Sequence, residues 1–278
     1  MFRADLRRLR AIGLLAAFVS APAVRAEPQS IAISDPRPVA AAMERLESVF
    51  GIPITYEDPP YSDPRTIVDV TSAVRRGRED LGAGRVLIPR GSDFSFSFDA
   101  PTAPVGGSRP PAVALATGQR RPVFGDAASR AISSALKSHA DSGDSTVFSA
   151  MRDGHGGFHV VPVRVSNPAG HLEPARPLFD TAISIGAKKR MGMELVSEIC
   201  ESLSMSTGTK VFVGTFPVSL FAAWVSAVTA VDEPARSVLD RFLGESAVLL
   251  SWQLFYDPGL RLYTLNIHPV RSVQRETR

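Results

Sequence analysis

Apolar residues recur at helical spacing near the start of the chain and then alternate as in a strand. The helically spaced positions are Val39, Met43, Leu46 and Phe50. Their spacing predicts a helix with one apolar face. Asp35 is its predicted cap, and Gly51 suits the left-handed residue that ends many helices. Over 52–56 every second residue is apolar, which predicts a half-buried strand directly after the helix.

The same two periods mark the other elements. Strict alternation of Phe and Ser over 94–98 predicts a strand with one apolar face. Two stretches, 145–165 and 249–271, are typical of β-hairpins, because turn residues separate two strand-like runs in each. Further strands are predicted at 65–74, 85–89, 209–217 and 222–231, and further helices from Asp126, over 193–205 and from Asp232.

One phrase is written twice, as HVVPVR at 159–164 and NIHPVR at 266–271. Each copy closes a predicted hairpin, and a helix precedes each hairpin. The order helix, strand, strand, helix, hairpin is thus predicted twice. Pro162 and Pro269 are expected to leave the sheet at the same place, because proline cannot donate to a β-ladder. Coincidence among common α/β segments is the alternative explanation.

This order predicts an α/β fold of the α+β type, made of two related units. Each unit is expected to pack helices on a small mixed sheet that ends in a β-hairpin. The first unit is predicted at 27–165, with a Pro/Gly-rich insertion at 99–122 that holds one short strand candidate, AVALA at 112–116. A proline-containing linker at 166–180 and a second unit at 181–278 follow.

Residues 1–26 have the layout of a secretory signal peptide, with four arginines before an apolar run of nine residues, 11–19. We expect cleavage after Ala26 and a periplasmic location. Five of the 31 basic residues and one of the 28 acidic residues lie in this segment, so the rest is close to neutral. Nucleic acid is therefore not expected as a partner.

The segment 211–231 holds 21 residues without a charge, which is enough to cross a membrane. Gly214 and Pro217 interrupt it, and its Val and Phe content favours buried strands. No stable membrane span is therefore expected after cleavage of the signal, with a membrane segment at 211–231 as the alternative.

Four patterns could carry chemistry, and each also has a structural explanation. Ser134 and Lys137 fit Ser-x-x-Lys, but the companion motifs of penicillin-recognising enzymes are missing. His155 and His159 are four apart, but two glycines between them predict a turn and not a zinc-binding helix. Cys200 lies on the apolar face of its predicted helix, as a core cysteine does. We therefore expect no catalytic residue, no metal site and no cofactor.

The fourth pattern is YEDPPYSDP at 56–64. Exposed tyrosines beside carboxylates can contact a peptide, a sugar or a divalent ion. Consecutive turns built on Asp and Pro are the structural alternative. Tyr56, Asp58 and Tyr61 are the candidate binding residues.

Two stretches carry a resemblance, RPVAAAMERLESVFGIPITYEDP at 37–59 and DEPARSVLDRFLGESAVLLSWQLFYDPGLRLYTLNI at 232–267. The first resembles the start, and the second the end, of the short N-terminal modules of secretins and TonB-dependent receptors (STN modules). The resemblance implies small periplasmic α/β modules that bind proteins or signalling partners without catalysis. The insertion at 99–122 departs from it, and no functional residue is carried over.

The sequence thus predicts an exported, non-catalytic protein that binds a protein partner in the bacterial cell envelope. Its oligomeric state does not follow from the sequence. The alternative is a periplasmic hydrolase with a site between the two units that uses His139, His159 or Ser134.

Overall fold

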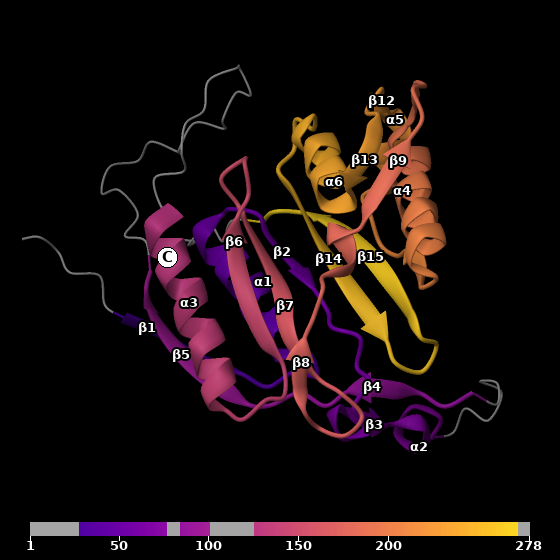
Figure 1. Ribbon diagram of the computed structural model, residues 1–278. Coiled ribbons are helices and arrows are strands. Elements are labelled where there is room, and N and C mark those ends of the chain that lie inside the picture. Colours follow the sequence, from indigo (N-terminus) through magenta and orange to yellow (C-terminus); the bar gives the residue numbers. More distant parts are fainter. Residues whose placement is uncertain (1–27, 77–83, 101–124, 272–278) are drawn as a thin grey trace, which may run out of the picture.

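A computed structural model describes residues 28–76, 84–100 and 125–271, and the predicted signal peptide and the AVALA strand lie outside these ranges. Figure 1 shows a central mixed sheet with helices on both of its faces. The sheet has the order β11-β15-β14-β2-β7-β6, and β8 pairs with the end of β7. Its strands are β2 (Ile54–Glu57), β6 (Val147–Arg152), β7 (Phe158–Ser166), β8 (Leu172–Pro174), β11 (Lys210–Val213), β14 (Leu250–Asp257) and β15 (Leu262–Pro269). The predicted α/β fold is confirmed.

The first half packs two helices between two sheets. Helices α1 (Pro38–Phe50) and α3 (Gly125–Asp141) lie against β2, β7 and β6 on one side. On their other side lies a two-stranded ribbon, β1 (Pro28–Ile33) with β5 (Phe94–Asp99). The three Phe side chains of β5 are buried and the serines between them are exposed, so the predicted alternation is confirmed.

The second half has the same connectivity. Helices α4 (Gly192–Thr207) and α6 (Ala235–Gly244) pack against β11, β15 and β14. A second ribbon, β9 (Ala182–Ile185) with β13 (Ala230–Pro234), covers their other side. In both halves the strand after the first helix, β2 or β11, pairs in parallel with the second strand of the hairpin, β7 or β15.

The two halves join where β14 pairs in parallel with β2. Along β14, Gln253 points towards α1 and binds Glu44, whereas its neighbour Trp252 points the other way and binds Asp240 on α6. The helices of the two halves therefore cover opposite faces of one continuous sheet. Strand directions are also reversed between the halves, so their layouts are related by a half-turn about an axis that runs across the strands, combined with a shift of three strand positions.

Three smaller excursions complete the described chain. After β2, a 3-10 turn leads into β3 (Ile67–Asp69) and α2 (Thr71–Val74), and β4 (Leu87–Pro89) pairs back with β3. In the second half β10 (Arg190–Met191) pairs with β12 (Val225–Ser226), with α5 (Val218–Ala223) just before β12. The predicted linker at 166–180 is not plain coil, since it holds β8 and a 3-10 turn.

The expectation for the two prolines is wrong. Pro269 is the last residue of β15, but Pro162 lies inside β7, which continues to Ser166. Pro162 faces Phe148 beside a β-bulge in β7, where Val163 has no partner in β6. A bulge disrupts the ladder locally, so the missing N–H of proline is tolerated there.

The uncharged segment 211–231 is divided among β11, α5, β12 and the start of β13. Among the described residues, no helix is both long enough and apolar enough to span a bilayer. The strand predicted at 222–231 is replaced in part by α5, and several of its apolar side chains are exposed, such as Val225 and Val231. The strand predicted at 65–74 is likewise only three residues long, between a 3-10 turn and α2.

Candidate functional site

The three candidate binding residues meet at one carboxylate, that of Asp58, which has no exposed surface. Tyr56 and Tyr61 donate their hydroxyls to Oδ1 of Asp58 at 2.8 and 3.0 Å. Arg37 Nε donates to Oδ2 at 2.6 Å, and the backbone N–H of Tyr256 donates to the same oxygen at 2.9 Å. Asp58 thereby ties the start of α1 to β14 of the other half.

Burial sets the protonation of this cluster. It raises the pKa of Asp58, while the charge and hydrogen bond of Arg37 oppose that rise. Burial and the neighbouring charge of Asp58 also raise the pKa of Tyr61 well above its ordinary value, so its hydroxyl remains a donor at neutral pH. The expectation of exposed side chains is wrong for Tyr56 and Asp58, because both are buried. Tyr61 is half-buried and lines a surface groove.

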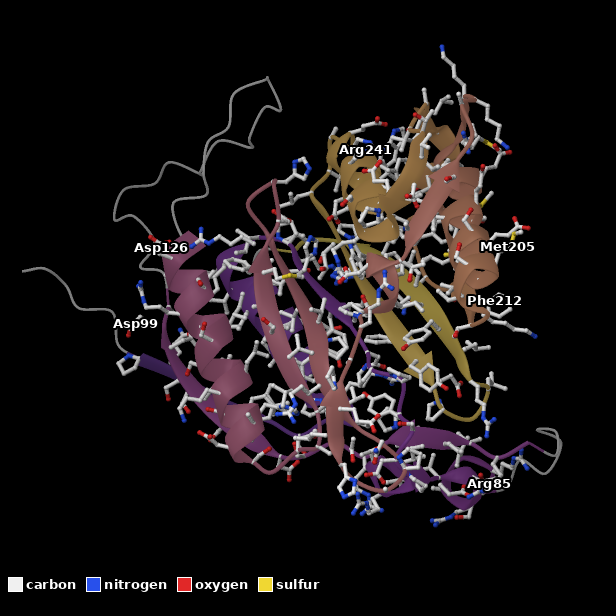
Figure 2. All side chains as sticks on the ribbon, in the orientation of Figure 1. Arg85, Asp99, Asp126, Met205, Phe212 and Arg241 are labelled. Carbon is white, nitrogen blue, oxygen red and sulfur yellow. The ribbon has the colours of Figure 1, made fainter. Side chains whose placement is uncertain are left out.

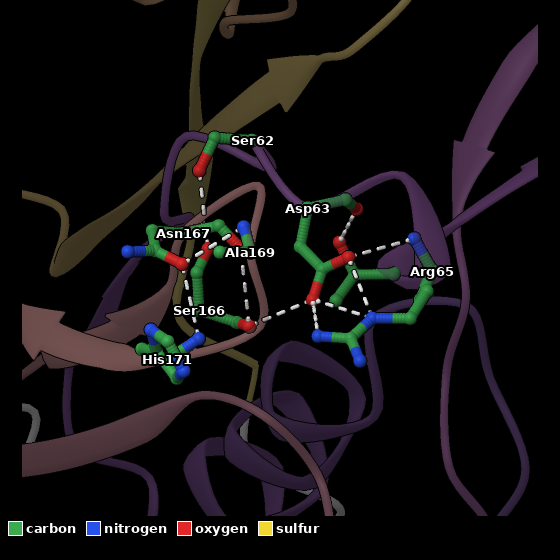
Figure 3. A network of polar contacts seen from close by, with 8 residues as sticks. Ser62, Asp63, Arg65, Ser166, Asn167, Ala169 and His171 are labelled. Carbon is green, nitrogen blue, oxygen red and sulfur yellow. Dashed lines mark hydrogen bonds and ion pairs between the residues drawn. The ribbon is translucent and has the colours of Figure 1, made fainter.

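The turn that carries Tyr61 is anchored a second time, at Asp63 (Figure 3). The carboxylate of Asp63 accepts hydrogen bonds from the backbone and guanidinium of Arg65 and from the Ser166 hydroxyl at 2.7 Å. These hydrogen bonds hold the pKa of Asp63 well below its ordinary value. Ser62 donates to the backbone oxygen of Ser166 at 3.1 Å. The segment 61–66 is thus fixed to the end of β7.

Between this turn and the tip of the β14–β15 hairpin lies an open groove of about 520 Å³. Tyr61 and Tyr256 form its aromatic part, with ring centroids 6.4 Å apart. Tyr256 packs in turn on the buried Tyr263 at 4.9 Å. The remaining lining residues are Ser62, Pro64, Ile67, Asp69, Arg85, Leu87, Pro258 and Arg261.

The groove carries a positive balance, with Arg85 and Arg261 against one carboxylate, Asp69. Arg85 pairs with Asp69 at 2.8 Å, and both side chains are well exposed. Figure 2 places Arg85 beside the β3–β4 excursion, below the hairpin tip. Arg261 adopts the left-handed backbone conformation, with φ of 55°, at the end of the hairpin turn. Aromatic rings, prolines and arginines are the surface that an extended peptide with acidic residues fits.

On the opposite face of β2, polar side chains tie the halves together. Thr55 Oγ1 lies 2.7 Å from His159 Nδ1, and His159 Nε2 lies 2.9 Å from Asp240 on α6. A hydroxyl, an imidazole and a carboxylate in line are the parts of a hydrolase triad. However, Thr55 and His159 are buried in paired strands, at 3% and 5% exposure, and neither lines the groove. This geometry supports a structural tie across the junction.

Glu57 makes a second tie on this face. Its carboxylate accepts hydrogen bonds from Arg236 of α6 at 2.9 Å and from the backbone of Leu178. Arg236 also binds Asp180 at 3.0 Å and lies over the ring of Trp252. Burial raises the pKa of Glu57 to about 7, although Arg236 and the Leu178 amide oppose the rise.

The other candidates for chemistry have structural partners. Ser134 donates to the backbone oxygen of Ser97, and Lys137 pairs with Asp141. His139 is buried under Phe94 and lies 3.2 Å from Asp144. Burial raises the pKa of the Cys200 thiol to about 12, which leaves it protonated. Within the described ranges, no three His, Cys, Asp or Glu side chains gather as a metal ion requires.

Comparison with known proteins finds no family model that matches the chain, no similar curated protein and no similar solved structure.

Sequence reasoning located Tyr61 but missed the other half of the groove. Tyr256 and Arg261 lie about 200 residues further along the chain and reach the groove only because β14 pairs with β2. The local signal in this hairpin was Asp257-Pro258-Gly259, which reads as an ordinary turn.

Proposed function

We propose that this chain is an exported, non-catalytic protein of the bacterial cell envelope that binds an extended peptide segment of a partner protein. The observation that supports binding most directly is the groove between Tyr61 and Tyr256, flanked by Arg85 and Arg261. Export is supported by the pattern of residues 1–26. The connectivity of each half is compatible with the STN-like resemblance, which remains part of the proposal.

The groove is suited to binding because its aromatic wall is fixed before a ligand arrives. Tyr61 is held by Asp58, and its turn is held by Asp63 and Ser166. Side chains that are already ordered lose little conformational entropy on binding. Tyrosine and arginine are also the residue types that contribute most to binding energy at protein interfaces.

The test is selection from a displayed library of random peptides against the chain, followed by affinity measurement on variants. We expect selection of proline-containing peptides with acidic residues. Tyr256→Ala is expected to lower the affinity for these peptides at least tenfold, since truncation of a central aromatic residue costs roughly 2 kcal/mol or more of binding energy. Arg261→Glu is expected to lower the affinity for acidic peptides and to raise it for basic ones.

Arg130→Glu is the matched control, because Arg130 is exposed on α3, far from the groove. Tyr61→Phe keeps the ring and removes only the hydroxyl bound to Asp58, so it should lose some affinity with the lost ordering of the ring, but less than Tyr256→Ala loses. Selected peptides that bind Tyr256→Ala and Arg261→Glu as tightly as the wild type would place the binding surface elsewhere and refute the proposal. Failure to select any peptide would count equally against it.

A further inference from the structure

The internal junction between the halves shows what the two outer edges of the sheet can do. Within the described residues, β11 pairs only with β15, and β6 pairs only with β7. In the repeated connectivity β11 is the counterpart of β2, and β6 is the counterpart of β14. These counterparts, β2 and β14, are the two strands that pair in parallel at the internal junction.

We infer that the chain assembles head to tail with copies of itself, with β11 of one copy added in parallel to β6 of the next. Such a contact repeats the β14–β2 junction and continues the sheet. An unpaired edge strand offers a row of N–H and C=O groups to another strand, so the chemistry of the contact is backbone hydrogen bonding.

The counterpart positions follow from the strand registers. Gly51 and Gly208 both end a helix in the left-handed conformation, and the third residue after each, Ile54 or Val211, is buried against its own helices. Thr55 therefore corresponds to Phe212. Thr55 is 3% exposed at the internal junction, whereas Phe212 is 52% exposed at the outer edge.

The other edge shows the same contrast. Tyr56 pairs with Val160 and its counterpart Val213 pairs with Leu265, so Ala150 on β6 corresponds to Leu254 on β14. The next residues are Met151 and Phe255. Phe255 is half-buried beneath the guanidinium of Arg37, whereas Met151 is 41% exposed.

The internal register also predicts the register between copies. Gln253 lies opposite Tyr56 and Leu254 opposite Glu57. The corresponding pairs are Ser149 with Val213, and Ala150 with Gly214, of the next copy. Ser149, Ala150 and Gly214 are small, which permits this approach. Because the contact joins two different edges, it continues into oligomers larger than a dimer unless a ring closes.

The test uses one blocked edge at a time. Phe212→Lys blocks the β11 edge and Met151→Lys blocks the β6 edge, because each places a charge where the contact would bury it. Light scattering after size exclusion should show concentration-dependent oligomers for the wild type and monomers for each variant alone. A mixture of the two variants retains one intact edge of each kind and should form one-to-one dimers that do not grow further.

Val231→Lys is the control, since Val231 is 87% exposed on β13 and belongs to neither edge. It should associate as the wild type does. A wild type that stays monomeric, or a mixture of blocked variants that stays monomeric while the wild type associates, would refute the inference. Association that survives in either single variant would also refute it, because it would indicate a symmetric contact. Peptide binding in the groove tests the proposed function separately, as neither blocked residue lines the groove.

Discussion

The buried carboxylate of Asp58 accepts hydrogen bonds from Arg37, two tyrosine hydroxyls and a backbone amide, so its charge is matched on every side. Asp58→Asn keeps the shape but turns one acceptor into a donor and leaves Arg37 without its counter-ion. We expect a loss of roughly 2–4 kcal/mol in the free energy of unfolding, since breaking one partner of a buried pair leaves an uncompensated charge. Urea unfolding followed by circular dichroism measures it. Asp99→Asn on the exposed side of β5 is the control and should change stability little; an equal effect in both variants would contradict the role given to Asp58.

Glu57 gives the fold a pH dependence of known sign. Its pKa is about 7 in the folded chain and about 4.5 ordinarily. Between these values the folded state holds a proton that the unfolded state has lost, so the stabilising contribution is complete below about pH 4.5 and is lost as the pH rises through 7. Relative to Glu57→Gln, the wild type should lose on the order of 2–3 kcal/mol between pH 5 and pH 8. Glu201 is exposed on α4, so Glu201→Gln should show the same dependence of the free energy of unfolding on pH as the wild type. If Glu57→Gln also showed the same dependence as the wild type, the prediction would be contradicted.

In YEDPPYSDP, the local sequence predicts which side chains cluster but not how exposed they are. Tyr56 and Tyr61 both donate to Asp58, so the three predicted binding residues lie in one hydrogen-bond network, and their role in binding stays a prediction. Exposure could not be predicted, because the atoms that bury Asp58 come from Arg37 on one side and Tyr256 on the other. Turn residues are usually exposed. Asp58 is buried here because β14 pairs with β2 and brings Tyr256 next to it.

Elements with a strong period were predicted well. The helix ending at Gly51, the alternating Phe strand and both hairpins are confirmed. The ribbon strands β1 and β9 were missed, because their partners lie about 60 and 45 residues away in β5 and β13. A strand stabilised by a distant partner needs little local signal. Pro162 is tolerated inside β7 because of a bulge at the next residue, Val163, which shows only in the pairing with β6.

For the whole molecule, the continuous sheet and the ties at Asp58, Glu57 and His159 imply that the two halves unfold together. Both tryptophans, Trp224 and Trp252, pack in the core of the second half, and the ring of Trp252 also lies 6.1 Å from that of His159, so their fluorescence reports the second half and its junction. Leu46→Ala removes a fully buried side chain from the first half and should cost about 2–5 kcal/mol. If the halves are coupled, the tryptophan transition in urea must move to lower concentration together with the helical signal in circular dichroism. Two separate halves would leave the tryptophan transition where it is in the wild type.

Arg236→Met breaks the contact with Glu57. It should begin to separate the tryptophan fluorescence transition from the circular dichroism transition, because part of the coupling between the halves passes through that buried pair.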